Sequence, residues 1–194
     1  MRKLFVILCA ALAIVLGGSA KSNAQCAFPD GTVGINLGLG LGHSTWNHPG
    51  YNHYWDDVFV PSFNFALDYG FLPNIINSNG CISGGGYFSF GHGSQKFNGD
   101  SKDLCSQWRI GTRGALHYTW VRNLDTYAGV ALGAKGESNK WKHADGHKEG
   151  PWKSTDFDIY GFGGVRYIMG NFAVYSELAT TNFAWFQVGI SFVL

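Results

Sequence analysis

Charged side chains are scarce in this chain. Asp, Glu, Lys and Arg together make up 14% of the 194 residues, and the formal net charge at pH 7 is +1. Disordered chains combine high charge with few aromatic residues, whereas 16% of this chain is aromatic, so its composition excludes disorder. A net charge near zero also gives no electrostatic reason to expect a nucleic-acid partner.

Long apolar runs are also lacking, apart from one at the amino terminus. That run, residues 4–16, follows Arg2 and Lys3 and precedes a group of small residues. A charged start, an apolar segment and small residues are typical of a secretory signal peptide. The run is too short for a good transmembrane helix, and no second run follows it.

The small residues Ser22 and Ala24 form a cleavage site of the small-x-small type. This site predicts that residues 1–24 are removed as a signal peptide, with Ala20 as the alternative position. The remaining residues 25–194, about 170 in number, suit a single domain.

Apolar residues alternate with small or polar ones through most of this domain. In the last twelve residues, FAWFQVGISFVL, the side chains of Phe186, Val188 and Ile190 share one face of a strand. Such a strand is an aggregation hazard when its edge is open, so we expect it to pair with the first strand and close the sheet. A closed sheet with an apolar outer face needs an apolar solvent, which predicts a barrel in a membrane.

The same period of two predicts eight strands. The expected ranges are 32–42, 58–71, 81–91, 108–120, 126–135, 157–167, 172–179 and 183–194. The fold class is therefore all-β, an eight-stranded antiparallel up-and-down transmembrane β-barrel.

The predicted connections differ in length on the two sides of the barrel. Three are long and polar: residues 43–57, 92–107 and 136–156. Those after the second, fourth and sixth strands are short or rich in turn residues. Small outer-membrane barrels keep short turns in the periplasm and longer loops outside, so both termini are expected in the periplasm.

Three stretches resemble a known family. They are SNAQ at residues 22–25, GVRYIMGNFAVYSEL at residues 164–178 and GISFVL at residues 189–194. The chain resembles small outer-membrane barrels of the OmpA/OmpX type, in the version common among Bacteroidetes. The resemblance implies a monomer in the bacterial outer membrane that contacts outer-membrane lipid, lipopolysaccharide and, during biogenesis, the insertion machinery.

The inward positions of the predicted strands carry a set of ionisable side chains. Arg109, Lys135 and Asp158 are expected toward the outside, Arg113, His117 and Glu177 near mid-height, and Asp68 and Arg166 lower. Unpaired charges are costly to bury, so opposite charges in a lumen should pair. Side chains just fill an eight-stranded barrel, which favours a plug of ion pairs over the alternative, a narrow pore.

The predicted outer loops are rich in aromatic residues and histidine. Candidate binding residues for a glycan or protein partner are Trp46, Trp55, Trp141, His143, His147 and Trp152. The alternative is that these aromatics pack over the barrel mouth or lie at the lipid headgroup level. His143 and His147 have metal-binding side chains, but spacing within a loop fixes no geometry, so neither a metal nor a cofactor is expected.

An enzymatic alternative rests on His92 and Ser94. Their His-x-Ser spacing resembles the motif of outer-membrane lipid A deacylases, but in that family the motif lies near the end of the chain. A serine nucleophile needs a base that is held by a third group, and the sequence fixes no such arrangement. The prediction is therefore a non-enzymatic barrel that presents surface loops for envelope integrity or binding.

Three cysteines follow the predicted signal peptide: Cys26, Cys81 and Cys105. Cys26 and Cys81 map to the periplasmic end of the barrel and Cys105 to the other end. The periplasm permits disulfides, so we expect a Cys26–Cys81 bridge that ties the amino-terminal lead across the periplasmic mouth. Three reduced thiols are the alternative.

Overall fold

A computed structural model describes residue 26 and residues 28–47, 55–75, 78–96, 102–143, 146–181 and 183–194. The predicted signal peptide, residues 1–24, lies outside these residues. No helix in the described part of the chain is long and apolar enough to cross a membrane.

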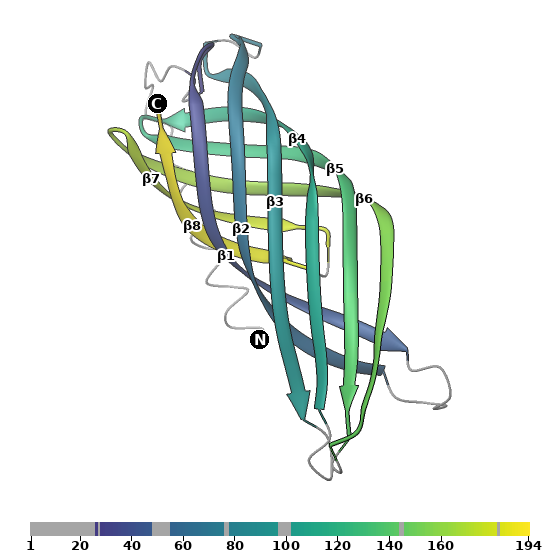
Figure 1. Cartoon of the computed structure of the whole chain (residues 1–194). Coiled ribbons are helices and arrows are strands. Elements are labelled where there is room, and N and C mark those ends of the chain that lie inside the picture. The colour runs from purple at the N-terminus through teal and green to yellow at the C-terminus, as the bar shows by residue number, and fades with distance from the viewer. Residues whose placement is uncertain are drawn as a thin grey trace.

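Eight strands form one closed ring in chain order (Figure 1). The strands are β1 Val33–Asn47, β2 Trp55–Pro73, β3 Gly80–Lys96, β4 Lys102–Val121, β5 Leu124–Lys142, β6 Lys148–Met169, β7 Phe172–Ala179 and β8 Phe186–Val193. Every neighbouring pair is antiparallel, and β1 closes the ring by pairing with β8 from Gly34↔Val193 to Leu41↔Phe186. The predicted eight-stranded up-and-down barrel is confirmed.

The two faces of the wall differ sharply in chemistry. On β2, the outward Phe63 and Leu67 are 47% and 43% exposed, whereas the inward Ser62 and Asp68 are 4% and 1% exposed. The same alternation on the other strands surrounds the barrel with exposed large apolar side chains. A surface of this kind is stable only where an apolar solvent covers it.

Six strands are longer than the sequence suggested. β1–β6 contain 15 to 22 residues each, while β7 and β8 contain 8. The predicted loops 43–57, 92–107 and 136–156 are therefore mostly strand. The hydropathy period disappears there because polar side chains occupy both faces, although the backbone pairing continues. The last strand is shorter than expected, since residues 183–185 form a bend and Phe183 is buried.

The unequal strand lengths leave part of the sheet standing beyond the closed ring (Figure 1). β8 pairs with β1 only as far as Leu41, and β7 pairs with β6 only as far as Phe162. Past these pairs the strands continue as two open parts: the β1–β2 hairpin, residues 42–47 and 55–60, and a four-stranded sheet of β3–β6, residues 92–96, 102–106, 138–142 and 148–153. The described residues of β2 and β3 do not pair beyond Ser62 and Gly91. We call the two parts together the protruding sheet.

Tight turns join the strands at the opposite end of the barrel. Arg122 and Asn123 connect β4 to β5, and Gly170 and Asn171 connect β6 to β7. Asn123 and Gly170 have φ values of 71° and 69°, which two-residue hairpin turns require and which Asn and Gly tolerate best. The short turns thus lie at one end and the protruding sheet at the other.

Candidate functional site

The lumen nearest the protruding sheet contains an ion pair between β4 and β6. Arg109 Nε lies 3.2 Å from Asp158 Oδ2, and both side chains are buried. The Arg109 guanidinium also lies over the rings of Tyr160 and Phe183, 5.3 Å and 4.9 Å from their centroids. Phe183 reaches this position because the chain bends before β8. The pair and the rings together fill this layer of the barrel.

The middle of the lumen is organised around Arg113. Its Nε lies 3.2 Å from Asp68 Oδ1, and its Nη2 donates a hydrogen bond of 3.0 Å to Glu177 Oε2. Gln187 on β8 donates a hydrogen bond to the other Glu177 oxygen. The Phe162 ring lies 4.0 Å from the guanidinium carbon of Arg113. One cation therefore links two acids that lie more than a hundred residues apart in the chain.

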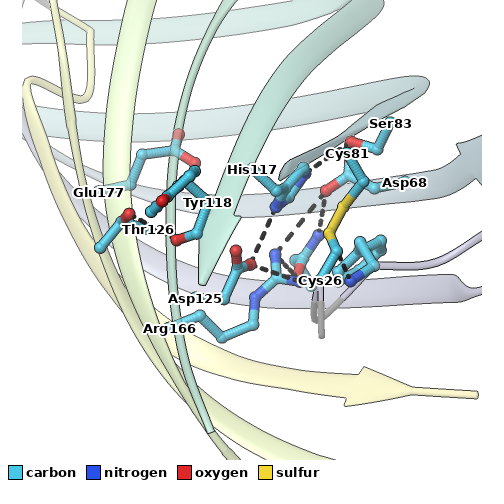
Figure 2. Close-up of polar contacts among 12 residues, drawn as sticks. Cys26, Asp68, Cys81, Ser83, His117, Tyr118, Asp125, Thr126, Arg166 and Glu177 are labelled. Atoms are coloured by element: carbon cyan, nitrogen blue, oxygen red, sulfur yellow. Dashed lines mark hydrogen bonds and ion pairs between the residues drawn. A yellow bond between two sulfur atoms is a disulfide. The ribbon is translucent and has the colours of Figure 1, made fainter. Parts of the chain in front are cut away.

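The lowest layer holds His117, Asp125 and Arg166 (Figure 2). His117 Nδ1 lies 2.9 Å from Asp125 Oδ2, and His117 Nε2 lies 2.8 Å from the hydroxyl oxygen of Ser83. Arg166 Nη1 lies 4.0 Å from Asp125, and Nη2 lies 3.9 Å from Asp68. All these side chains are buried, so the layer is a continuous polar network inside the wall.

Asn36 connects this lowest layer to Asp68. Its amide group donates a hydrogen bond of 2.8 Å to Asp68 Oδ2, and its carbonyl oxygen accepts one of 3.1 Å from Arg166 Nη2. Asp68 contacts Arg113 as well. The middle and lowest layers are therefore one network, to which all eight strands contribute polar side chains.

The structure buries all seven acidic and basic residues that were predicted to form a lumen network. They are Asp68, Arg109, Arg113, His117, Asp158, Arg166 and Glu177. One expectation needs correction: His117 lies in the lowest layer rather than near mid-height. Lys135 lies opposite the inward Arg109, as expected, but its side chain is exposed.

Asp125 is a member of the network that the sequence prediction missed. The sequence predicts that the fifth strand begins at residue 126, but Asp125 is the second residue of β5 and is fully buried. The sequence does contain this information, because Asp125 is two residues before the inward Tyr127 and therefore falls on the same face of the strand. Extending the inward pattern one step toward the turn would have found it.

A small cavity remains between the Arg109 and Arg113 layers. It is bordered by Tyr87, Ser89, Tyr160 and Glu177, and the space open to the centre of a water molecule is about 20 Å³. That volume suits about one water. The Tyr87 hydroxyl faces this region and has no protein hydrogen-bond partner among the described residues. The ion pairs and rings of the three layers fill the lumen around this cavity, as expected of a plug rather than a pore.

A short segment crosses the barrel mouth at the end with the tight turns. We call this segment, Cys26 and residues 28–32, the strap. The structure pairs Cys26 with Cys81 in a disulfide, with 6.0 Å between the Cα atoms. The backbone N–H of Cys26 donates to the carbonyl of Ser78 at 2.9 Å, and that of Gly31 donates to the carbonyl of Gly70 at 3.0 Å. The strap is thus attached at both of its ends.

Phe28 is the part of the strap that enters the lumen. Its side chain is completely buried. Its ring stacks on the His117 imidazole with centroids 4.8 Å apart and an interplanar angle of 14°, and the Arg166 guanidinium lies 4.7 Å from its centroid. A Cβ atom at Gly34 would stand 2.5 Å from the Phe28 ring, so this position needs glycine. Phe28 is a plug beneath the polar network.

Cys105 lies far from this mouth, near the protruding sheet. Its side chain is buried beside Val60, and its thiol lies 3.5 Å from Glu137 Oε1 as a hydrogen-bond donor. Cys105 thus lies at the opposite end of the barrel from Cys26 and Cys81, as predicted.

One face of the protruding sheet carries lysine residues. Lys102 on β4 lies directly opposite Lys142 on β5, which lies directly opposite Lys148 on β6. By the strand alternation, Lys140 and Lys153 lie on the same face. We call these five residues the lysine face. Among the described side chains on this face of β4–β6, none is acidic.

The predicted aromatic and histidine residues of the surface are partly on the opposite face. Trp141 lies opposite Glu149 in the β5–β6 ladder, and both Trp141 and Trp152 are half-buried strand residues. The His143 ring lies 5.7 Å from that of His147, and His143 Nε2 lies 3.0 Å from Glu149 Oε1. The side chains of Trp46 and Trp55 are outside the described part of the chain.

His92 is also a strand residue rather than a loop residue. Its Nδ1 lies 2.9 Å from the hydroxyl oxygen of Ser106, which faces it from β4. The hydrogen bond of this imidazole thus goes to the neighbouring strand and not to Ser94, its partner in the deacylase-like motif. The geometry therefore gives no support to a His92–Ser94 catalytic pair.

Comparisons with known proteins support the fold. No protein-family model matches the chain, and no curated protein matches it either. A crystal structure of Ail, the attachment invasion locus protein of Yersinia pestis, in complex with the heparin analogue sucrose octasulfate, is similar with a TM-score of 0.51 and 14% identity. The match covers 84% of this chain and 95% of that chain.

Two further structures of the same Yersinia pestis protein also match. A crystal structure of Ail has a TM-score of 0.48 and 15% identity over 84% of this chain and 95% of that one. The backbone structure of outer membrane protein Ail in a phospholipid bilayer nanodisc has a TM-score of 0.40 and 15% identity over 85% of this chain and 100% of that one. The likeness to the sucrose octasulfate complex is one of fold: eight antiparallel strands in a closed ring.

Proposed function

We propose that this protein is a non-enzymatic bacterial outer-membrane barrel that binds anionic saccharides through the lysine face. In this proposal residues 1–24 are a signal peptide, the tight turns and both termini are periplasmic, and the protruding sheet stands outside the cell. The apolar belt supports the membrane location, because exposed residues such as Phe63 and Leu67 need lipid around them.

The lysine row is the observation that carries the binding function. Like charges directly opposite each other in a sheet destabilise it. Lys102, Lys142 and Lys148 nevertheless form three consecutive cross-strand neighbours, with no acidic side chain among the described residues of that face. A bound polyanion would remove this repulsion and would find several ammonium groups at strand spacing, about 4.8 Å between neighbouring strands.

The position of the lysine face indicates which anion it meets. Lys140 and Lys142 lie on the face of β5 that carries the lipid-exposed Leu132, further along the strand. The other three lysines lie on the same face of β4 and β6. Lys140 is eight residues beyond Leu132, a distance of about 26 Å along the strand. The ammonium groups therefore point away from the barrel axis, just outside the membrane, at the level of the phosphorylated sugars of lipopolysaccharide. Ail offers a parallel, since it was crystallised with a sulfated saccharide.

The test compares two variants in lipid nanodiscs. The triple variant K102Q/K142Q/K148Q removes the row, and the control R122Q/K135Q removes two exposed cations elsewhere. With surface ion pairs contributing about 0.5 kcal/mol each, the triple variant should bind phosphorylated lipopolysaccharide about tenfold more weakly. Binding should also weaken as salt increases. Equal affinity of the triple variant and the control would contradict the proposal.

A further inference from the structure

The strap contributes little to the barrel wall itself. It lies outside the eight strands, and its described backbone contacts with the wall are the hydrogen bonds to Ser78 and Gly70 and one from the Gly70 N–H to the Thr32 carbonyl, 2.9 Å long. The ring stays closed without the strap, because β1 pairs with β8 beyond it. The strap is therefore a separate element placed over a wall that is already complete.

The place that Phe28 occupies is a built slot. The His117 imidazole forms one side, at 14° to the ring, and the Arg166 guanidinium forms another. Both side chains are 1% exposed and are held by partners other than Phe28: Asp125 and Ser83 hold His117, and Asn36 holds Arg166. A slot with independently fixed sides keeps its shape when its occupant leaves.

Its chemistry selects a planar aromatic group. A guanidinium is attracted to the face of an aromatic ring, and an imidazole stacks on such a ring. An aliphatic side chain of similar volume would fill the space without either interaction. The slot is thus specific for the type of side chain that the strap supplies.

The disulfide decides whether Phe28 can leave. Fixing the backbone of the strap costs conformational entropy that offsets much of the free energy gained by burying the Phe28 ring. The Cys26–Cys81 bond removes most of this cost, because it holds the strap at the mouth and keeps the local concentration of Phe28 high. Without the bond, the strap is held by Phe28 and a few hydrogen bonds.

We propose that this mouth is a latched binding slot for an aromatic side chain, with Phe28 as the resident occupant and the Cys26–Cys81 disulfide as the latch. An external dithiol opens the latch by thiol–disulfide exchange. One dithiol thiolate attacks a sulfur of the bridge and forms a mixed disulfide, and its second thiol resolves that intermediate. The dithiol becomes a disulfide, and Cys26 and Cys81 each end as a thiol, a two-electron reduction. The open slot then accepts a phenylalanine side chain from another polypeptide.

The latch is tested by hydrogen exchange on the purified protein in detergent. The reporters are the backbone amides of Cys26 and Gly31, which donate hydrogen bonds to the carbonyls of Ser78, in the β2–β3 connection, and Gly70, on β2. In the oxidised protein both amides should be protected, and in the reduced protein and in the C26S/C81S variant the Gly31 amide should exchange at least about tenfold faster. Amides of β4 should keep their protection. Unchanged Gly31 exchange, or loss of protection throughout the barrel, would overturn the latch.

The slot is tested with a peptide that copies the strap, AFPDG, and a matched control, AAPDG. The receptor is the barrel from which residues 25–31 are deleted; if it does not fold, the full chain with C26S, C81S and F28A replaces it. The first peptide at millimolar concentration should raise the melting temperature of the receptor, while the control should not. It should leave the oxidised native protein unaffected, because its slot is occupied. Equal effects of the two peptides, or no effect of either, would overturn the proposal.

Discussion

Arg113 and Glu177 are 64 residues apart in the chain, yet Arg113 Nη2 lies 3.0 Å from Glu177 Oε2 inside the barrel. The contact joins β4 to β7, which are not neighbours in the ring. Arg113 also contacts Asp68 on β2. The three side chains therefore connect strands from different sides of the wall across the lumen.

Removal of Arg113 should be the most damaging change in this network. R113L leaves the buried carboxylates of Asp68 and Glu177 without their cation, so we expect the free energy of unfolding to fall by about 3–5 kcal/mol. E177Q should cost less, because Arg113 keeps Asp68 at 3.2 Å. Urea unfolding in detergent measures both. The double variant should lose less than the sum of the two single losses, and additive losses would contradict the coupling.

Asp125 gives a second prediction about the same network. D125N removes the charge that faces His117 Nδ1 and Arg166, and we expect a loss of stability of about 2–4 kcal/mol because both partners are buried. D156N is the matched control, since Asp156 is exposed on β6. It should change stability by less than about 0.5 kcal/mol. Melting curves that do not separate the two variants would place Asp125 outside the network.

Phe28 and Gly34 form a pair that a double-mutant cycle can resolve. F28A leaves a cavity at the barrel mouth and should lower the free energy of unfolding by about 3–5 kcal/mol. Water that enters the cavity would make this loss smaller. G34A should cost about 1–3 kcal/mol, since the added methyl group collides with the Phe28 ring.

The diagnostic result is the double variant F28A/G34A, in which the new methyl group occupies part of the space that the ring vacates. Its stability should be close to that of F28A alone. If G34A costs the same with and without Phe28, the collision with the ring is not the reason for glycine at this position.

The orientation of the barrel can be tested on whole cells. An epitope inserted at Gly146, between β5 and β6, should be accessible to antibody on intact cells. One inserted at Asn123, in the turn between β4 and β5, should become accessible only after the outer membrane is permeabilised. Both sites lie between strands, so neither insertion interrupts the wall. Labelling of Asn123 on intact cells would reverse the proposed topology.

The sequence predicts the ring well because an apolar outer face and a filled lumen impose a strict alternation of side chains. Phe63, Phe65 and Leu67 must face outward, and this fixes the direction of every side chain between them. The same rule correctly placed Arg109, Arg113 and Asp158 in the lumen. In the protruding sheet polar side chains occupy both faces, so the strand continuation through Trp141 and Trp152 carries no hydropathy signal.

Two features of the mouth were harder to read from sequence. Asp125 follows a two-residue turn so closely that its polar character suggested part of that turn. The position of Phe28 depends on packing across the barrel, on His117 of β4 and Arg166 of β6, and a local pattern holds no information about contacts over such sequence distances. The Cys26–Cys81 prediction came from assigning both residues to the same end, and the structure places their Cα atoms 6.0 Å apart.

The short β7 and β8 make the barrel wall unequal in height around the ring. β3 to β6 extend well beyond the closed ring, whereas β7 and β8 end within it (Figure 1). β6 forms an open edge in this extension, because its residues 148–160 pair only with β5 among the described strands. Lys148, Lys153 and Asp156 lie on this edge. Charges on an open edge discourage strand addition by a neighbour. In the proposed membrane location, crowded copies would therefore meet differently on the two sides, and their packing would have a direction that a barrel of even height lacks.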